Sequence, residues 1–367
     1  MVNFGQRQVS KESTTQLPVS WYFDSGIYEA ELNVLFQQGT NYVGHESMVP
    51  NVGDYYVLPW RENAQVLVRN QHGVELLSNV CRHRQVIMLD GQSNTRNIVC
   101  PLHRWSYDLE GKLIGAPFFS SNPCLNLKKT PLQNWNGLLF DVSRDVTQDI
   151  SGLHSTENFD FSGYVLDRVQ IDDYPINWKT FMEVFQDNYH VLPRHPGLKE
   201  FVDCDDFQWE LGDQCSVHSI GLKNNLSNSG TPVYERWSQA VRAQCGNETP
   251  RYGGIWLAYY PNLLIEWFPD ALVVNVVLPR SPVLTTVMVS FYYPKEIFQF
   301  KREFVEAQQA ALMETAAEDD EIAFKMTEGR RVLHLAGDDD AGPYQVPLED
   351  GVRHFHSFLR RKLEAYS

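Results

Sequence analysis

The chain has 367 residues, 43% of them hydrophobic, which is enough for about two domains with sizeable cores. Its net charge of −15 argues against binding to nucleic acid or to an anionic membrane. The sequence lacks any run of about 18 apolar residues, so we expect no transmembrane helix. Residues 1–7 lack the apolar stretch of a secretory signal, and we expect a cytoplasmic protein.

The first 41 residues are predicted to be a lead-in that packs on the second domain, with helical character over 29–36. The next part of the chain is rich in turns and in short β-favouring runs, which predicts a compact antiparallel domain over 42–150. These runs lie at 55–58, 66–69, 74–77 and 138–141.

Two Cys–His pairs lie within this first domain. Cys81-Arg82-His83 is followed, after sixteen residues, by Cys100-Pro101-Leu102-His103. Two thiolates on one iron and two neutral imidazoles on the other are the ligands of a Rieske 2Fe–2S cluster. Structural zinc is the alternative, but zinc sites usually pair C-x-x-C with H-x-x-x-H. The spacing therefore predicts an electron-transfer cluster, and the other four cysteines are interpreted as free thiols.

The second half, residues 151–367, is predicted to alternate long strands with helices. Helices are expected at 176–189, 300–317 and 352–366, and strands at 256–259, 263–267, 271–278 and 283–291. Residues 222–250 are polar and poorly periodic, and are interpreted either as a surface excursion or as a lid over a substrate pocket.

A second candidate metal site lies at Asp187-Asn188-Tyr189-His190, which His195 follows five residues later. Pro193 stands between the two histidines, so a helix end that turns into a loop could bring them together. Two imidazoles and one carboxylate form the facial triad of non-haem Fe(II) oxygenases. The acidic run 318–321 is the best source of the carboxylate. Taken alone, such histidines are more often structural and such a run is usually solvated; the preceding cluster motif gives them weight.

Together, the two motifs make the chain resemble the catalytic (α) subunit of the Rieske non-haem iron ring-hydroxylating oxygenases. The resemblance covers nearly the whole chain and rests on C-x-H…C-P-L-H-R-W-S-Y-D and on N-W-K-x(7)-D-N-Y-H-x(4)-H. It implies an α+β fold with an antiparallel β Rieske domain over 42–150. It also implies a helix-grip catalytic domain over 151–367, in which helices flank a long antiparallel sheet.

The resemblance also implies roles for single residues. Cys81 and Cys100 would bind one cluster iron, and His83 and His103 the other. The mononuclear iron would be bound by a set of three: His190, His195 and Asp320. Asp320 is preferred to Asp319 because Ile322 and Phe324 then fall where the family has apolar helix residues.

Further roles concern electron transfer between subunits. Asp187 would bridge a cluster histidine and a catalytic histidine across the subunit boundary of a homotrimer, and Asn177 with Trp178 would position the helix beside the iron. The family often has Gly where this chain has Gln85 and Arg104. This departure concerns the potential of the cluster and partner docking, not ligation.

The implied activity is that of a terminal oxygenase. It would use O2 and electrons from a separate NAD(P)H-dependent reductase, with or without a ferredoxin, because the chain has no G-x-G-x-x-G fingerprint of its own. We expect hydroxylation or oxidative demethylation of a small organic molecule. The alternatives are cis-dihydroxylation of an aromatic ring and electron transfer without oxygenase activity.

An aromatic cage for a quaternary ammonium substrate is a further hypothesis. Core packing is the alternative interpretation of the six aromatic residues concerned. They are Tyr234, Trp237, Tyr252, Trp256, Tyr259 and Tyr260.

Overall fold

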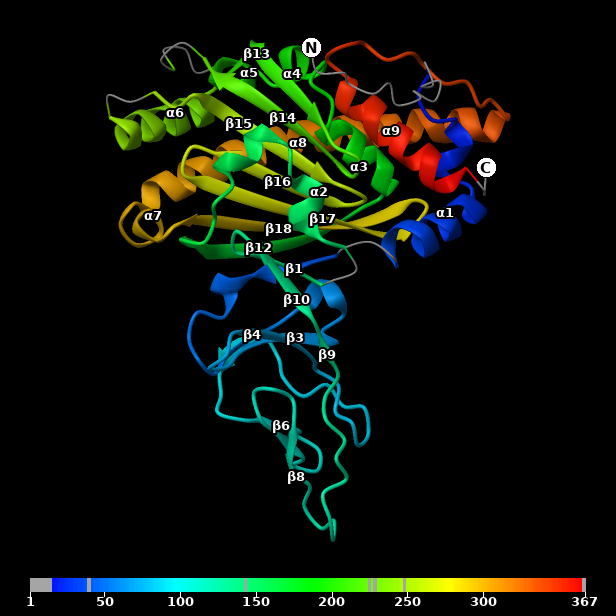
Figure 1. The fold of residues 1–367 in the computed structure, drawn as a ribbon. Coiled ribbons are helices and arrows are strands. Elements are labelled where there is room, and N and C mark those ends of the chain that lie inside the picture. Colours follow the sequence, from blue (N-terminus) through cyan, green and yellow to red (C-terminus); the bar gives the residue numbers. More distant parts are fainter. Residues whose placement is uncertain are drawn as a thin grey trace, which may run out of the picture.

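The structure is a computed structural model that describes residues 15–37, 41–141, 144–223, 226, 230–246 and 249–364. A large antiparallel sheet with helices on one side forms the upper part of the molecule in Figure 1, and a smaller β domain extends below it. This is the α+β arrangement that the sequence predicts.

The smaller domain consists of a five-stranded sheet, in the order β5-β2-β3-β4-β9, and a three-stranded sheet, β6-β7-β8. Val66, Val68 and Leu77 pack with both motif cysteines in one core between these sheets. Its strands are β2 (Asp54–Val57), β3 (Gln65–Arg69), β4 (Val74–Ser78), β5 (Gln92–Asn94), β6 (Ile98–Val99), β7 (Ser106–Tyr107), β8 (Leu113–Gly115) and β9 (Lys129–Thr130).

The large sheet has seven antiparallel strands in the order β12-β18-β17-β16-β15-β14-β13. Because side chains alternate along a strand, β17 sends Val274 and Val276 to one face and Val273 and Val277 to the other. The strands are β12 (Tyr164–Tyr174), β13 (Val202–Leu211), β14 (Cys215–Leu222), β15 (Tyr252–Tyr259), β16 (Leu263–Phe268), β17 (Ala271–Ser281) and β18 (Leu284–Pro294).

A third sheet joins the two parts. It is formed by β1 (Asn41–His45), β11 (Leu138–Asp141) and β10 (Leu132–Trp135). Phe140 of this sheet packs with Ile265 and Met288 of the large sheet in a continuous apolar core. One face of the large sheet is therefore occupied by the small domain, which leaves the other face for helices. The short helix α2 (Val146–Ile150) follows β11.

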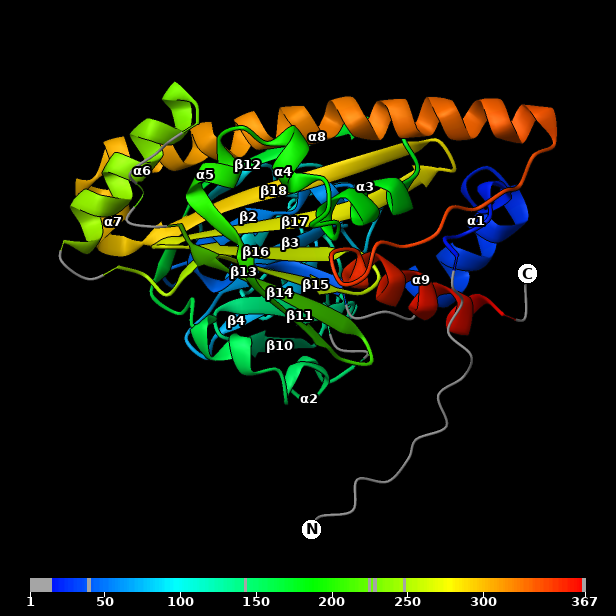
Figure 2. The same ribbon diagram turned by 90° about the horizontal axis from the view of Figure 1, so that it is seen from above.

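The helical face is dominated by α8 (Arg302–Ala336), which runs along the whole sheet in Figure 2. The sequence predicts a helix over 300–317 here, whereas the structure has one helix of 35 residues that continues to Ala336. The charged residues 318–321 do not interrupt it, because the many Ala and Glu residues around Asp319 and Asp320 are good helix formers and outweigh the weaker propensity of Asp. It ends at Gly337, whose φ of 73° is the left-handed conformation that favours glycine.

Residues 222–250 contain a helix that the sequence analysis missed, α6 (Pro232–Cys245). The Thr231 side chain caps it by accepting from the Tyr234 N–H. Tyr234, Trp237 and Val241 are buried against the residues of α8 and α5 (Leu198–Phe201). The polar residues between these positions hid the helical period. Residues 224–225, 227–229 and 247–248 lie outside the described residues, and a lid role stays a prediction.

The lead-in contains α1 (Ser25–Glu31) and a turn of π-helix over Leu32–Phe36. Trp21 and Tyr22 pack with Phe355 and Phe358 of α9 (Asp350–Leu363), next to α3 (Trp178–Phe185). The remaining helices are α4 (Val191–Arg194) and α7 (Lys295–Phe300). The domain limits at 41/42 and 150/151 stay predictions. None of the helices in the described part of the chain has an apolar stretch that would cross a bilayer.

Candidate metal centres and substrate pocket

The two cluster loops bring the four predicted ligands together at the tip of the small domain. Each loop is closed by a backbone hydrogen bond from its cysteine, Cys81 to Val86 at 2.9 Å and Cys100 to Trp105 at 2.8 Å. Both cysteines are buried. The rings of His83 and His103 lie 4.7 Å apart, centre to centre.

This arrangement fits a Rieske cluster. The Nδ1 atom of His83 is buried but has no hydrogen-bond partner, and buried polar atoms are rarely left unpaired unless something else binds them. The same ring stacks on Trp105 at 4.9 Å, which fixes its direction. The two loops thus supply two buried thiols and two neighbouring imidazoles, the ligand set of a Rieske 2Fe–2S cluster.

Gln85 and Arg104, where the family often has glycine, both adopt positive φ angles of 54° and 62°. Their N–H groups bond to the carbonyls of Cys81 and Cys100 at 3.1 Å. Each loop therefore uses the left-handed turn for which glycine is best suited, and a side-chain-bearing residue costs about 1 kcal/mol there. The departures from the family pattern change the strain of the loops and leave their shape intact.

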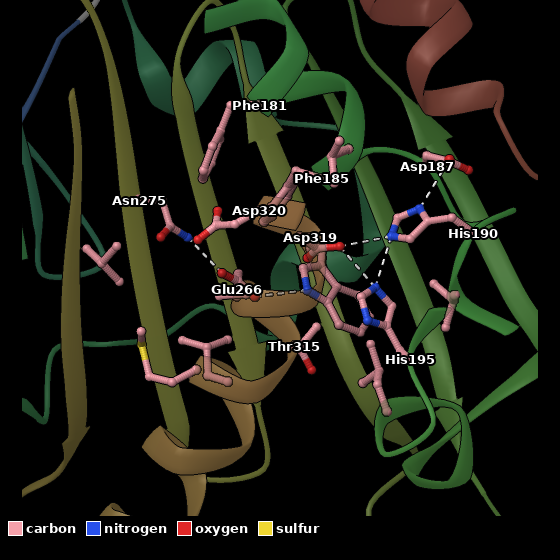
Figure 3. A pocket seen from close by; sticks show the side chains of 18 of the residues that line it. Phe181, Phe185, Asp187, His190, His195, Glu266, Asn275, Thr315, Asp319 and Asp320 are labelled. Atoms are coloured by element: carbon pink, nitrogen blue, oxygen red, sulfur yellow. Dashed lines mark hydrogen bonds and ion pairs between the residues drawn. The ribbon is translucent and has the colours of Figure 1, made fainter. Parts of the chain in front are cut away.

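The second site lies between the large sheet and α8. Helix α3 ends at Phe185, and the short helix α4 begins directly after His190 and ends directly before His195. The spacing predicts a helix end that turns into a loop between the histidines, whereas the structure has one short helical turn, α4, between them. The Nε2 atoms of the two rings are 3.0 Å apart. Figure 3 shows both rings turned toward the carboxylate of Asp319.

The carboxylate in this group belongs to Asp319, and the preference for Asp320 does not agree with the structure. Asp319 Oδ1 lies 3.1 Å from Nε2 of His190 and 3.0 Å from Nε2 of His195. The sequence favours Asp320 because Ile322 and Phe324 then take the family's apolar helix positions, but Phe324 is 36% exposed, whereas Ala323 is buried. Ala323 is four residues after Asp319 and so shares its face of the helix.

Two further carboxylates hold the outer nitrogens of the histidine rings. Asp187 Oδ2 lies 3.1 Å from Nδ1 of His190, and Glu318 Oε2 lies 2.7 Å from Nδ1 of His195. Burial alone would lower the pKa of His190, but Asp187 and Asp319 together raise it to about 9. Such partners fix the direction of metal-binding rings. The Nε2 atoms of His190 and His195 and the carboxylate of Asp319 are three donors, and the outer carboxylates fix the direction of both rings, which fits a facial iron site. Glu318 was not singled out from the sequence.

Asn177 lies outside this group. Its side chain caps α3 by accepting from the Lys179 N–H, and it donates to the carbonyls of Tyr22 and Pro282. The neighbouring Trp178 donates to Glu31 at 2.7 Å. Both residues therefore fix α3 beside the pocket, as predicted for a positioning role, and neither lines the pocket.

A pocket opens beside Asp319, between the sheet, α3 and α8. Phe181, Phe185 and Val289 form part of its apolar wall. Its charged residues are acidic: Asp172, Glu266 and Asp320 line it together with the metal-site carboxylates, and none of the described lining residues is Lys or Arg. Burial and the charges of Asp319 and Asp172 raise the pKa of Asp320 to about 6.

Of the six aromatic residues proposed as a cage, only Trp256 lines the pocket. Tyr234 and Trp237 belong to the core between α6 and α8, and Tyr259 and Tyr260 are buried in other cores. Core packing is therefore the correct interpretation for those four. Side chains alternate between the two faces of a strand, but both faces of this sheet are covered, so the alternation does not show which face contains the pocket.

Comparison with known proteins gives the family. Residues 157–365 match the ring hydroxylating alpha subunits (catalytic domain), and residues 39–131 match the Rieske [2Fe-2S] domain. The chain is 54% identical over 352 residues to a putrescine 2-hydroxylase of Ralstonia nicotianae, with 96% of each chain covered. It is 46% identical over 376 residues to a putrescine 2-hydroxylase of Bordetella bronchiseptica, with 98% of this chain and 87% of that one covered.

Solved structures share the fold. A quaternary ammonium Rieske monooxygenase superposes with a TM-score of 0.77 at 17% identity, with 96% of each chain covered. Naphthalene 1,2-dioxygenase from a Rhodococcus species superposes with a TM-score of 0.74 at 19% identity, with 95% of this chain and 94% of that one covered.

The chain belongs to the catalytic alpha subunits of the Rieske ring-hydroxylating oxygenases. Such a subunit binds a Rieske 2Fe–2S cluster and a mononuclear iron, and uses O2 as co-substrate. It is an oligomeric oxidoreductase that hydroxylates small molecules and works with a reductase. The prediction of a terminal oxygenase is confirmed, and it is supported over ring dihydroxylation and over electron transfer alone.

Proposed function

We propose that this chain hydroxylates a short aliphatic diamine, with putrescine as the first candidate. The observation that carries the proposal is the charge of the pocket, where Asp172, Glu266 and Asp320 face a space with no Lys or Arg among its described lining residues. An ammonium group at each end of the substrate would neutralise these carboxylates. The names of the two relatives at 54% and 46% identity point to the same substrate.

The reaction would insert one atom of O2 into a C–H bond of the diamine. The other atom would leave as water, with two electrons from an NAD(P)H-dependent reductase and two protons. Activation of O2 is the chemistry that the mononuclear iron supplies when bound. The protein holds the metal ligands, orients the substrate and keeps the reacting carbon in a partly apolar space beside Phe181 and Phe185.

We assign the ligands as follows. Cys81 and Cys100 would bind one cluster iron, and His83 and His103 the other. The mononuclear iron would be held by His190, His195 and Asp319, because these three side chains offer ligand atoms within 4.8 Å of one another. Asp187 and Glu318 would orient the two rings from outside.

We also propose a homotrimer in which electrons cross between subunits. Figure 1 places the cluster end of the small domain, near β6 and β8, far from α4 and the histidines that flank it. A neighbouring subunit can supply a nearer cluster. His103 and Leu102 are exposed at the cluster end, and Asp187 reaches the surface beside the exposed side chains of Tyr189 and Leu192. Two different exposed patches on one chain suit a head-to-tail ring.

A single-turnover experiment tests the substrate without the natural reductase. Anaerobically purified enzyme with both centres loaded is reduced chemically, mixed with putrescine and exposed to O2, and the products are analysed by mass spectrometry. We expect a product heavier by one oxygen atom, labelled when ¹⁸O2 is used. Butylamine, choline and toluene are the comparison substrates. Absence of product from putrescine and from longer diamines, with both centres loaded, would overturn the proposal.

A further inference from the structure

Glu266 is a buried carboxylate in the pocket wall, and no Lys or Arg among the described residues forms an ion pair with it. It lies on β16 and is 7% exposed. Its two oxygens accept from neutral donors, Asn275 Nδ2 at 2.7 Å and Trp256 Nε1 at 3.1 Å. A buried charge without a counter-charge is costly. Burial accordingly raises the pKa of Glu266 to about 7, and the nearby charge of Asp319 adds to this. The negative charge of the Glu266 carboxylate, close to the metal ligands, can therefore be neutralised by a bound cation.

Two other buried side chains of the same pocket have polar atoms without partners. Among the residues that the structure describes, neither the nitrogen nor the oxygen of the Asn188 amide has a hydrogen-bond partner, although Asn188 is 4% exposed. The Nε2 atom of His218, which is 8% exposed, also has no partner. Burial lowers the pKa of His218 to about 3, so its ring is neutral and can accept a hydrogen bond. Unsatisfied groups at this depth are rare in proteins and indicate a polar ligand.

The strand register places an aromatic surface beside Glu266. Trp209, His218, Trp256 and Glu266 are consecutive cross-strand neighbours from β13 to β16. His218 stacks on Trp209 at 4.3 Å between ring centres, and Trp256 bonds to Glu266 through its indole N–H. A cation held by Glu266 therefore lies against aromatic rings, which favour positive charge.

A second acidic position lies across the pocket. Asp172 is on β12 and Asp320 is on α8, and both line the pocket. In the sheet register Glu266 aligns through Val273 and Phe291 with Arg168, so Asp172 lies three strands away and four residues further along β12. Both side chains line the pocket together with Asp320, and an alkyl chain with an ammonium group at each end can bind a carboxylate at both positions.

We propose that Glu266 binds one ammonium group of the diamine next to the metal site, while Asp172 and Asp320 bind the other. The inference rests on the proposed diamine substrate and adds the residues that recognise its two ends. Asp319 directly precedes Asp320 in the chain and its charge also acts on Glu266, so a diamine bound at both ends lies beside the metal ligands. The pocket thus distinguishes a diamine from a monoamine.

The first experiment removes the charge of Glu266 without changing its shape. Glu266→Gln should raise the KM for putrescine on the order of 30-fold or more, because a buried ionic partner is lost, and should affect kcat less. Glu266→Asp, which keeps the charge, should recover part of that loss. Glu235→Gln, an exposed carboxylate on α6 outside the pocket, is the control. An unchanged KM in Glu266→Gln, with both metal centres loaded, would overturn the assignment.

The second experiment separates the two ends of the substrate. Asp172→Asn should lower the ratio of kcat/KM for putrescine to that for butylamine about tenfold, because only the diamine has a second ammonium group. A ratio equal to that of the wild type would remove Asp172 from the site.

The failure of this inference is distinguishable from failure of the proposed function. If the wild-type enzyme oxidises no diamine, the proposed function is wrong. If the wild-type enzyme oxidises putrescine but the Glu266 variants have an unchanged KM, only the proposed recognition site is wrong. A visible spectrum of the cluster and the iron content of each variant show whether it is folded.

Discussion

The carboxylate of Asp187 lies 3.1 Å from Nδ1 of His190, so this aspartate holds the outer edge of a ring whose inner nitrogen faces Asp319. We predict that Asp187→Ala keeps both metal centres but lowers turnover at least about 100-fold, since the ring loses its orientation and the electron its path. Iron content and the cluster spectrum should match the wild type. Retained turnover would contradict the relay.

Mixed oligomers test whether electrons cross between subunits. Asp187→Ala chains keep a good cluster, and His103→Ala chains keep a good mononuclear site. If each cluster serves its neighbour, co-expression of the two variants should restore activity that neither has alone. Lack of restoration in oligomers shown to contain both chains would place the electron path within one chain.

The choice between the two adjacent aspartates can be measured directly. We expect Asp319→Asn to lower the iron content from about three to about two atoms per chain, because the facial site loses its carboxylate. Asp320→Asn should keep all the iron and should weaken diamine binding instead. The reverse pattern would restore the assignment made from the sequence alone.

Glu318 is expected to tune iron affinity through His195. Glu318→Gln removes the charge 2.7 Å from Nδ1 of that ring and should weaken binding of the mononuclear iron by 10- to 100-fold, a typical effect of partners outside the metal ligands. Titration of the metal-free protein with Fe(II) measures this. Glu314→Gln, one turn earlier on α8 and bonded to Thr231, is the matched control.

The acid stability of the catalytic domain should depend on Glu183. Burial alone would raise its pKa, but Arg330 at 2.7 Å and His356 at 2.9 Å hold it at about 2, below the ordinary 4.5. A lowered pKa stabilises the fold above pH 4.5, and this stabilisation is lost as the pH falls toward 2. We predict that Glu183→Gln lowers the free energy of unfolding by roughly 3 kcal/mol at pH 7. Urea unfolding at pH 7 and pH 3 should show a smaller difference in the variant than in the wild type.

Much of this protein could be predicted from local sequence. The spacing of Cys81, His83, Cys100 and His103 predicts the cluster because iron–sulfur chemistry tolerates few ligand patterns. The β-branched runs predict β3, β4, β17 and β18, because alternation and β propensity act over a few residues. The five-residue spacing of His190 and His195 predicts that the two rings meet, although the helix breaks before His190 and Pro193 lies within α4.

Tertiary packing decided what neighbouring residues could not. Asp319 and Asp320 are separated by about 100° around a helix, so only the rotation of α8 against the sheet determines which one meets the histidines. Glu266 looks like any acidic residue in a strand until the sheet is assembled, and Trp256 resembles the aromatic residues that fill the cores. Metal ligands can be recognised by their spacing along the sequence. A binding pocket, in contrast, is formed by faces of helices and strands that meet only when the core is packed.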